Sequence, residues 1–303
     1  MMIKKTNLKS IYANLCRYYA KKLGDRPGDL VYRLLCSLKF YKEHGYYPRF
    51  KKPRTFSEKI WYRMLFDRNP IWTELSDKLK AKEFVKKRIG ERHIVPSLWI
   101  GQRAEEIPFE KLPNKFVIKT NHGGGYNIIV TDRESLDRAK TIHKINTWLK
   151  ASFTYTKFLG MAWAYKNIDP KVFIELFIEE NGKIPLDYKF FCFSGRVEYL
   201  LITYDRFGYH REKHFYKDFT PLDLWNGADQ YAGPFIRPEN FEEMIEIAEN
   251  LSAGFDFIRV DLYNIKGKIY FGEFTCYPAG GLARFVPRNW DFIFGEKWNL
   301  KIV

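Results

Sequence analysis

The stretch Phe257–Gly281 most constrains how this chain can fold, because it has the pattern of two β-strands joined by a tight turn. In its first half, hydrophobic residues alternate with polar ones that include Arg259 and Asp261, so these charges share one face. The turn lies at Asn264-Ile265-Lys266-Gly267, where glycine tolerates positive φ. The second half carries Glu273 near its end, so two carboxylates are expected on neighbouring strands.

These two carboxylates, Asp261 and Glu273, form a candidate magnesium site. Mg²⁺ binds a few carboxylate oxygens and takes its remaining ligands from water and phosphate. The alternative is a surface hairpin whose charges face water. Glu273, however, lies among Phe271, Gly272 and Phe274, which are unusual neighbours on a solvated strand face. We therefore expect a metal-binding hairpin.

The length and composition indicate a folded intracellular protein of one or two domains. Its 303 residues are 46% hydrophobic and 18% aromatic, enough for a substantial core. The four cysteines, Cys16, Cys36, Cys192 and Cys276, contain no CxxC pair, which argues against zinc and disulfides and predicts a reducing cytoplasm. The start of the chain lacks an apolar signal-peptide core, and no apolar run approaches the roughly 20 residues that span a bilayer.

The amino-terminal fifth is strongly basic, since residues 1–60 hold 15 of the 51 lysines and arginines but only 4 of the 36 acids. This asymmetry predicts an anionic partner, either a polyanionic substrate or a membrane face. Leu8, Ile11, Leu15 and Tyr19 recur at helical spacing, which fits either an interfacial helix or a helix packed on the protein body. Nucleic acid is not an expected partner, because no nucleic-acid-binding motif occurs.

Periodicity and turn signals predict a mixed α+β fold without regular βαβ alternation. Basic helices are expected within residues 1–50. A further helix begins at Thr55-Phe56-Ser57-Glu58, where Thr55 or Ser57 can cap it. The remaining expected helices span residues 76–89, 136–152 and 240–251. The remaining expected strands span residues 94–100, 115–119, 126–131, 171–177, 186–193 and 197–204.

A glycine-rich loop follows a strand that ends in a lysine, in the sequence FVIKTNHGGGYN. Gly123, Gly124 and Gly125 would let backbone N–H groups approach a phosphate, and Lys119 could supply a point charge. The segment is neither a Walker A sequence nor a G-x-G-x-x-G fingerprint. Standing alone, such a loop is more often a hairpin turn than a phosphate site.

Three further segments carry charges that could serve a nucleotide. Asp187 and Lys189 alternate on one face of a strand, where a local ion pair is the alternative interpretation. The helix expected at residues 76–89 carries Lys78 and Lys82, and we interpret Lys82 as part of a solvated helix face. The strand VFIELFIEE contains Glu175 and could equally be an amphipathic edge strand.

The order of these segments resembles that of the ATP-grasp ligases: a lysine helix, a lysine strand with a glycine loop, a hinge strand, a D-x-K strand and an R-x-D…E hairpin. Within that superfamily, VIKTNHGGGYNIIV, DYKFFCFSG and GEFTCYPAGG look most similar to the TupA-like group, which is associated with cell-surface polysaccharides. The resemblance implies two α+β lobes that grip a nucleotide. We expect a basic helical region over residues 1–75 and a nucleotide-binding and catalytic region over residues 76–303.

The resemblance also implies roles for individual residues. The adenine of ATP would meet the backbone of a hinge formed by Glu175, Leu176, Phe177 and Ile178. The ribose and phosphates would meet charged side chains and the glycine loop, namely Asp187, Lys78, Lys119, Lys189, Gly123, Gly124 and Gly125. Mg²⁺ would be held by Asp261, Glu273 and Thr275, where the family usually has asparagine at the third position. Arg259 and Lys189 would act on the reacting phosphoryl group.

The activity implied is that of a carboxylate–amine ligase, which forms an acyl phosphate with ATP and then an amide. The implied substrates are an amine and the uronic acid or glutamyl carboxylate of an anionic or lipid-linked surface glycan. His122, His210 and His214 are candidates for taking the proton of the amine. The alternatives are a glycan kinase, a glycosyltransferase, for which the chain lacks a D-x-D signature, and a glycan-binding module without activity.

Overall fold

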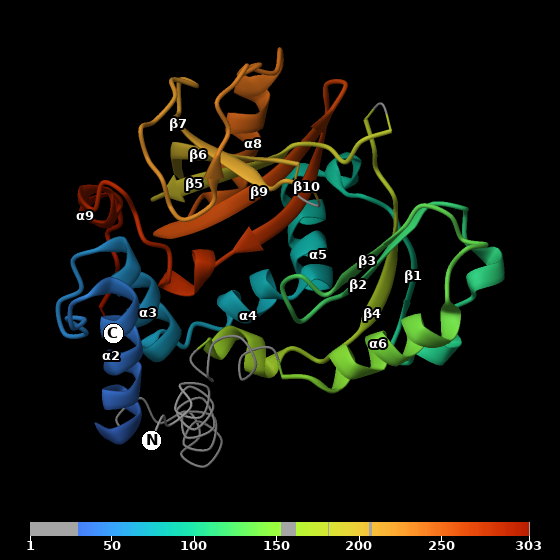
Figure 1. Cartoon of the computed structure of the whole chain (residues 1–303), viewed down its shortest axis with the longest axis horizontal. Helices are drawn as coiled ribbons and strands as arrows, with labels where there is room; N and C mark the ends of the chain where they lie inside the picture. The colour runs from blue at the N-terminus through green and yellow to red at the C-terminus, as the bar shows by residue number, and fades with distance from the viewer. Residues whose placement is uncertain (1–29, 153–161, 181, 206–207, 303) are drawn as a thin grey trace, which may run out of the picture.

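The computed structural model describes residues 30–152, 162–180, 182–205 and 208–302. Two largely antiparallel sheets form two lobes, with helices between and around them (Figure 1). The helices are α2 (Leu30–His44), α3 (Phe56–Phe66), α4 (Ile71–Ser76), α5 (Lys78–Ile89), α6 (Arg138–Lys150), α8 (Phe241–Ser252) and α9 (Asn289–Lys297). The strands are β1 (Ser97–Gly101), β2 (Phe116–Thr120), β3 (Asn127–Val130), β4 (Val172–Leu176), β5 (Asp187–Phe193), β6 (Arg196–Tyr204), β7 (Arg211–Tyr216), β8 (Asp229–Gln230), β9 (Phe257–Ile265) and β10 (Lys268–Thr275).

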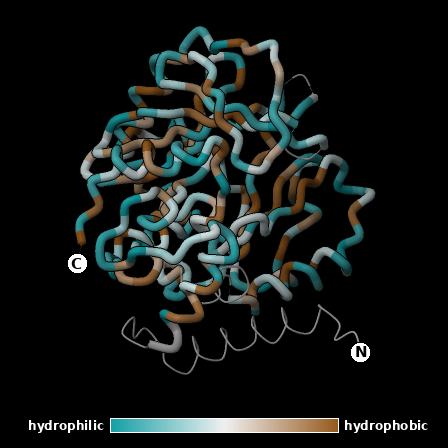
Figure 2. The backbone as a smooth tube through the Cα atoms, turned by 60° about the vertical axis from the view of Figure 1, so that its left-hand side comes forward, coloured by the Kyte–Doolittle hydropathy of each residue, from teal (hydrophilic) through white to brown (hydrophobic). Residues whose placement is uncertain are grey.

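The smaller lobe is built on a four-stranded sheet with the order β1-β4-β2-β3. β2 and β3 flank the glycine loop as a hairpin, and β4 pairs with both β1 and β2. Helix α6 packs against β2, and its Ile145 joins Phe116, Ile118 and Ile174 in a separate small core. Hydrophobic segments occur in both lobes, and hydrophilic ones dominate many of the connecting loops (Figure 2).

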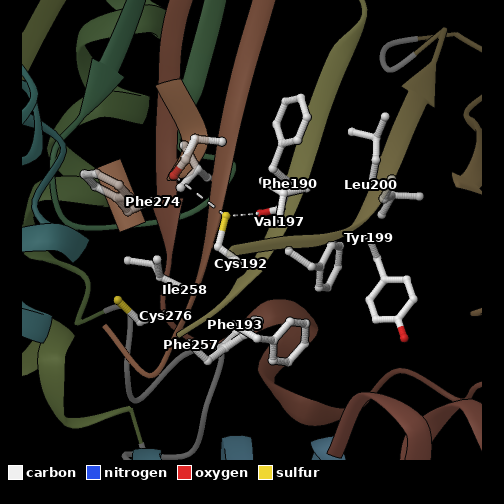
Figure 3. Close-up of a cluster of buried hydrophobic side chains, with 14 of the residues drawn as sticks. Phe190, Cys192, Phe193, Val197, Tyr199, Leu200, Phe257, Ile258, Phe274 and Cys276 are labelled. Carbon is white, nitrogen blue, oxygen red and sulfur yellow. Dashed lines mark hydrogen bonds between the residues drawn. The ribbon is translucent and has the colours of Figure 1, made fainter. Parts of the chain in front are cut away.

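The larger lobe is built on a six-stranded sheet with the order β10-β9-β5-β6-β7-β8. β5 lies between two helical layers, so its side chains alternate between them. Phe190 contacts Phe241 of α8, whereas Phe191 contacts Phe294 of α9, with ring centroids 6.0 and 5.9 Å apart. Cys192 returns to the α8 side, where its Sγ lies 3.8 Å from a carbonyl oxygen of that helix (Figure 3). The second half of β5 is buried on both faces, which agrees with its continuous hydrophobic run from Phe190 to Phe193.

Polar caps decide where helices α3 and α5 begin. Thr55 Oγ1 accepts a hydrogen bond from Glu58 N, and the Glu58 carboxylate accepts one from Thr55 N, both at 3.1 Å, which completes a capping box. The Asp77 carboxylate accepts from two backbone N–H groups in the first turn of α5. The helix expected to start at residue 76 therefore starts at Lys78, and the preceding turn forms α4.

The predicted α+β fold is confirmed, and the expected strands and helices of residues 55–275 lie within about three residues of their predicted bounds. β7, β8 and α9 were not predicted. Of the basic helices expected over residues 1–50, α2 is present, whereas the amphipathic stretch at residues 8–19 lies outside the described residues. Within the part of the chain that the structure describes, no helix is both long and apolar enough to cross a membrane.

Arg63 links α3 to the start of β9 from inside the core, with no exposed surface. Its guanidinium lies 4.2 Å from the Trp72 ring and 4.3 Å from the Trp298 ring, and it donates to Phe257 O at 2.8 Å. It also forms an ion pair with Asp256. Arg63→Ala is expected to lower the free energy of unfolding by about 3 kcal/mol, measured by urea denaturation, because Asp256 would lose its buried cationic partner.

The matched control is Arg237→Ala. Arg237 also lies over an aromatic ring, that of Phe241 at 4.8 Å, and pairs with a carboxylate, that of Glu242, but it does so on the surface. Exposed pairs contribute at most about 1 kcal/mol. Equal losses of stability in the two variants would contradict the importance of burial for Arg63.

Candidate active site

β9 and β10 place Asp261 directly opposite Glu273, and Arg259 opposite Thr275. This register depends on a bulge at Gly272, where β10 has one extra residue. A Cβ atom at Gly272 would lie 3.1 Å from Asp261 O, so glycine permits the close approach of the two strands. The four polar residues thus gather at the end of the hairpin that is remote from its turn.

Arg259 joins these residues into one cluster. Its Nε and Nη2 donate to the two carboxylate oxygens of Asp261, each at 2.7 Å, and Nη2 also donates to Thr275 Oγ1 at 2.9 Å. Glu273 Oε1 lies 3.6 Å from the same Nη2. Such a bidentate pair is a strong and directional contact. The structure therefore places Arg259 and Asp261 on one face, as their alternation in the sequence predicts.

The neighbouring strand β5 adds a second ion pair beside this cluster. Lys189 lies in register with Asp261 and forms an ion pair with Asp187. Burial raises the pKa of Asp261 to about 6, and Asp187 and Glu273 add to this, although Arg259 and Lys189 oppose it. Three carboxylates thus lie around only two cations. This excess of negative charge favours the binding of a further cation.

The carboxylates at this end of the hairpin suit Mg²⁺ in number and kind. The ion is usually held by one or two carboxylates together with water and substrate phosphates. Throughout the described residues, no group of three or more His, Cys, Asp or Glu side chains could hold a metal by itself. Thr275 is already engaged, because its Oγ1 accepts from Arg259 and lies 3.5 Å from Glu273 Oε1. Asp261 and Glu273 are therefore the better candidates for ligands.

A crevice with a cavity of about 100 Å³ lies between the two sheets beside this hairpin. Apolar side chains line it from both lobes, including Val117 and Ile129 from the smaller and Phe271 from the larger. The predicted site residues that line it are Lys78, Lys119, Gly125, Glu175, Leu176, Phe177, Ile178, Asp261 and Glu273. Those that line an adjoining second cavity are Lys78, Gly123, Gly124, Gly125, Arg259, Glu273 and Thr275. Asp187 and Lys189 line neither cavity but lie beside Asp261.

Glu175 is buried between two lysines in the small lobe. Its Oε2 lies 2.5 Å from Lys119 Nζ, and its other oxygen pairs with Lys82. Burial alone would raise the pKa of Glu175, but Lys119 and Lys82 together hold it below its usual value. The interpretation of Lys82 as part of a solvated helix face is wrong, because Lys82 is 9% exposed and donates to Val95 O at 2.8 Å. The side of α5 that carries Lys82 packs toward β1 and β4.

Lys78 is the first residue of α5 and reaches the glycine loop. Its Nζ donates to Thr120 O at 3.3 Å and to Gly123 O. Its own backbone N–H donates to Asn121 O at 3.1 Å, so the start of the helix is fixed against the end of β2. Burial lowers the pKa of Lys78, and the nearby charge of Lys119 acts in the same direction. Lys78 and Lys119 therefore repel each other, and an anion bound beside both would reduce this repulsion.

The three candidate histidines lie in different parts of the molecule. His122 follows β2, and its Nε2 lies 3.0 Å from Trp148 O. His210 is largely exposed and pairs with Glu212 at 3.0 Å. His214 is buried on β7, three strands away from β9. None of them lines the crevice or the second cavity, and His210 and His214 are not brought near the carboxylate cluster.

His214 should instead make the protein sensitive to acid. Burial lowers its pKa to about 3, so between about pH 3 and 6.5 the unfolded chain binds one more proton than the folded one. Stability should therefore fall as pH falls, by about 2 kcal/mol between pH 7 and pH 5 from this group alone. Urea denaturation at both pH values should show a smaller loss in His214→Leu, whereas His210→Leu should behave like the wild type.

Two features of the site were not predicted from the sequence. One is Lys82, four residues after Lys78 and therefore on the same side of α5, a spacing that could have signalled a shared role. The other is the second cavity, of about 390 Å³, whose lining includes Ser76, Tyr165 and Tyr277. Tyr277 follows the hairpin almost directly in sequence, but Ser76 and Tyr165 come from distant segments.

The chain has two α+β lobes around a crevice lined with lysines, next to a hairpin with paired carboxylates. These features are typical of an ATP-grasp protein. The sequence profile of the TupA-like ATP-grasp family matches residues 58–299, most of the chain. The chain belongs to the TupA-like ATP-grasp family. The predicted superfamily, group and ATP-grasp fold are therefore confirmed. A comparison with curated proteins gave no match.

Solved structures that resemble this chain include several ATP-grasp enzymes. The D-alanine–D-alanine ligase from Bacillus anthracis complexed with ATP has 16% identity and a TM-score of 0.38, over 67% of this chain and 54% of that one. The same enzyme from Helicobacter pylori has 16% identity and a TM-score of 0.42, over 74% and 59%. The ADP complex of PurK, N5-carboxyaminoimidazole ribonucleotide synthetase, has 12% identity and a TM-score of 0.42, over 67% and 45%. This chain spans about half the length of these proteins.

Proposed function

We propose that this chain is an ATP-dependent carboxylate–amine ligase that acts through an acyl phosphate. The supporting observation is the convergence of Asp261 and Glu273 with Arg259, Lys78 and Lys119 where the crevice meets the second cavity. The difficult step in such a reaction is to bring a carboxylate to the equally anionic γ-phosphate. Cationic side chains fixed in a partly buried site reduce that repulsion and stabilise the charge that develops during transfer.

ATP would bind in the crevice with its adenine at the end of β4. The N–H of Leu176 already donates to Pro96 O at 3.1 Å, so the adenine would pair with the backbone beyond the strand, at Phe177 and Ile178. Lys119 would contact the phosphates from β2. Lys78 and the glycine loop would cover the phosphates from the second cavity. Asp187 lines neither cavity, so we assign it no contact with the ribose.

Asp261 and Glu273 would hold Mg²⁺ between the phosphates and the hairpin. When bound, the ion would neutralise phosphate charge and polarise the transferred group. Arg259 would stay close to the reacting phosphoryl group, because Thr275 fixes its guanidinium at 2.9 Å. This assigns Thr275 to positioning Arg259 rather than to the metal.

The reaction would proceed in two displacements. First, a carboxylate oxygen of the substrate bonds to the γ-phosphorus of ATP, and the bond to ADP breaks. Arg259 and Lys189 would stabilise the negative charge that shifts between the groups. Then the amine nitrogen bonds to the acyl carbon, phosphate leaves with the electron pair of the C–O bond, and the amine loses a proton. No side-chain nucleophile is needed.

The carboxylate we propose belongs to a uronic acid or glutamyl group of an anionic surface glycan, as the family resemblance implies. The protein would then work in the cytoplasm, where its basic amino-terminal region could approach a lipid-linked glycan at the membrane face. The test is an assay of purified protein with Mg²⁺-ATP, uronic acid glycans and a pool of amino acids. ADP and free phosphate that require both a carboxylate and an amine would support the ligase. ADP with a phosphorylated glycan would indicate a kinase, and absence of turnover would contradict both.

The basic amino-terminal region gives a separate prediction. Lys51, Lys52 and Arg54 are exposed, and reversing all three charges to glutamate should weaken binding to vesicles that contain anionic lipid by at least about tenfold. ATP binding should not change, because these residues lie outside the crevice. The matched control reverses three exposed lysines elsewhere: Lys111, Lys266 and Lys268. Equal vesicle binding by the wild type and the first variant, in sedimentation assays, would contradict a role in membrane contact.

A further inference from the structure

A third cavity, of about 530 Å³, lies in the larger lobe beside the turn of the β9–β10 hairpin. Its walls come from the segment between β4 and β5, from the start of α8 with the residues that precede it, and from the hairpin turn. Hydrogen bonds join these three parts. Glu180 Oε1 accepts from Lys266 N at 3.1 Å, and Asn240 Nδ2 donates to Gly267 O at 2.8 Å. The cavity is therefore preformed, and its volume falls in the range of small-molecule sites.

The larger sheet separates this cavity from the proposed active site. Side chains of β5 alternate between the two faces of the sheet, and Lys189 lies in register with Asp261 of the carboxylate cluster. Tyr188 therefore points to the opposite face, on which Phe190 contacts Phe241 of α8. From that face Tyr188 lines the third cavity. A ligand bound there would lie across the sheet from the carboxylate cluster, so this cavity is not part of the ligase site.

Negative charge prevails in the third cavity, although the whole chain has a net charge of +15. The lining holds Glu180, Glu239 and Glu243 against one cation, Lys266, which leaves an excess of two negative charges. Within the part of the chain that the structure describes, none of these three glutamates forms an ion pair, whereas the neighbouring Glu242 pairs with an arginine. Carboxylates that gather in a cavity without a counter-charge attract a cationic ligand.

Tyr188 is a second and independent sign of a ligand. It is 5% exposed, and its hydroxyl makes no hydrogen bond with any of the described residues. Burial raises the pKa of Tyr188 to about 12, and the charge of Glu180 acts in the same direction. The hydroxyl therefore keeps its proton and can both donate and accept. Since a buried hydroxyl is costly to leave unpaired, its place in the lining indicates a ligand with a polar group.

Apolar side chains complete the lining and restrict the kind of cation. Leu186 and Pro238 are half-buried, and Ile236 is 76% exposed. A hydrated metal ion would leave these side chains without a partner. An organic cation would cover them with its hydrocarbon part while its charge meets the carboxylates.

We propose that the third cavity binds an aliphatic diammonium ion. Its two positive charges match the excess of two negative charges, and its methylene chain would lie against Leu186, Ile236 and Pro238. One ammonium group would donate to Tyr188 Oη and the glutamates would pair with both groups. This site goes beyond the proposed ligase function and does not depend on it.

The probe is 1,5-diaminopentane, titrated by ligand-observed NMR into the full chain at pH 7 and low ionic strength, without nucleotide or Mg²⁺. We expect saturable binding of the diamine. 1-Aminopentane should bind at least about threefold more weakly, because it forms fewer ion pairs. The neutral 1,5-pentanediol, which has the same chain length, should not bind detectably.

Two variants locate the site. Glu239→Gln/Glu243→Gln should weaken diamine binding about fivefold or more, because it removes two of the three carboxylates. Tyr188→Phe should weaken it about threefold to tenfold through the loss of a single hydrogen bond. The hydroxyl has no described partner, so the unfolding temperature of Tyr188→Phe should match that of the wild type.

The matched control is Glu242→Gln/Glu246→Gln, which removes the same charge from exposed positions of α8 outside the cavity lining. It should bind the diamine like the wild type. The proposal is overturned if the diamine does not bind, or if pentanediol binds as tightly. Equal weakening in the two double variants would overturn it as well, since the attraction would then be non-specific. Unchanged binding in Tyr188→Phe or in Glu239→Gln/Glu243→Gln would place the diamine elsewhere and contradict the site.

Discussion

Replacing Asp261 with asparagine is expected to lower ATP turnover at least about 100-fold while leaving the protein folded. The asparagine keeps the shape of the side chain but removes the charge that the proposed Mg²⁺ site needs. It also replaces one of the two oxygens that accept from Arg259, each at 2.7 Å, with an amide group that cannot accept. Turnover is measured as ADP release, and folding as the urea midpoint.

The control for this variant is Asp205→Asn. Asp205 also pairs with an arginine, Arg211 at 2.5 Å, but it is exposed and distant from the hairpin in the sheet. Its variant should keep wild-type turnover. If Asp261→Asn retained more than about a tenth of the wild-type rate, Asp261 would not hold a catalytic ion.

Replacing Glu175 with glutamine should destabilise the small lobe and weaken nucleotide binding together. Glu175 neutralises buried Lys82 and half-buried Lys119, and the change would leave these two lysines near each other without a counter-charge. Breaking such a buried cluster costs about 3–5 kcal/mol of folding stability. Lys119 should also lose its fixed position, so the affinity for ATP should fall. Urea denaturation and calorimetric titration measure the two effects.

Glu249→Gln is a close control, because Glu249 also joins two cations, Arg196 and Lys217, but these cations are exposed. Its loss should cost less than about 1 kcal/mol and leave ATP binding unchanged. Adding saturating ATP should recover part of the stability of Glu175→Gln, since the triphosphate replaces the missing negative charge beside Lys119. An unchanged stability in Glu175→Gln would show that Lys82 and Lys119 do not depend on Glu175.

The sequence predicted those parts of the site that depend on local periodicity and on the order of segments. The alternation in β9, for example, places Arg259 and Asp261 on one face. The cross-strand pairing of Asp261 with Glu273 could be expected from a tight turn, but the bulge at Gly272 that sets the register could not. A one-residue change in register depends on strand packing that leaves no local signal.

The parts that were missed depend on contacts between distant segments. Lys82 has the local pattern of an exposed helical lysine, but it is buried because its side chain contacts Val95 O and Glu175 of β4, which come from distant segments. The role of Thr275 as a metal ligand stays a prediction from the family pattern, and the structure adds that its hydroxyl accepts a hydrogen bond from Arg259. The second cavity forms where Ser76, Tyr165 and Tyr277 meet, and no sequence spacing relates these residues. β8 escaped prediction because it has only two residues, and β7 because four polar residues open it, Arg211 to His214.

The most direct test of the central claim is the effect of Mg²⁺ on nucleotide binding, since it requires no knowledge of the substrate. A non-hydrolysable ATP analogue is titrated calorimetrically, with and without Mg²⁺, into the wild type and into Asp261→Asn/Glu273→Gln. We predict that Mg²⁺ tightens binding by at least about tenfold in the wild type and has little effect in the double variant. Failure of the wild type to bind the analogue, or equal tightening by Mg²⁺ in both proteins, would contradict the assignment of this hairpin as the metal site of an ATP-dependent enzyme.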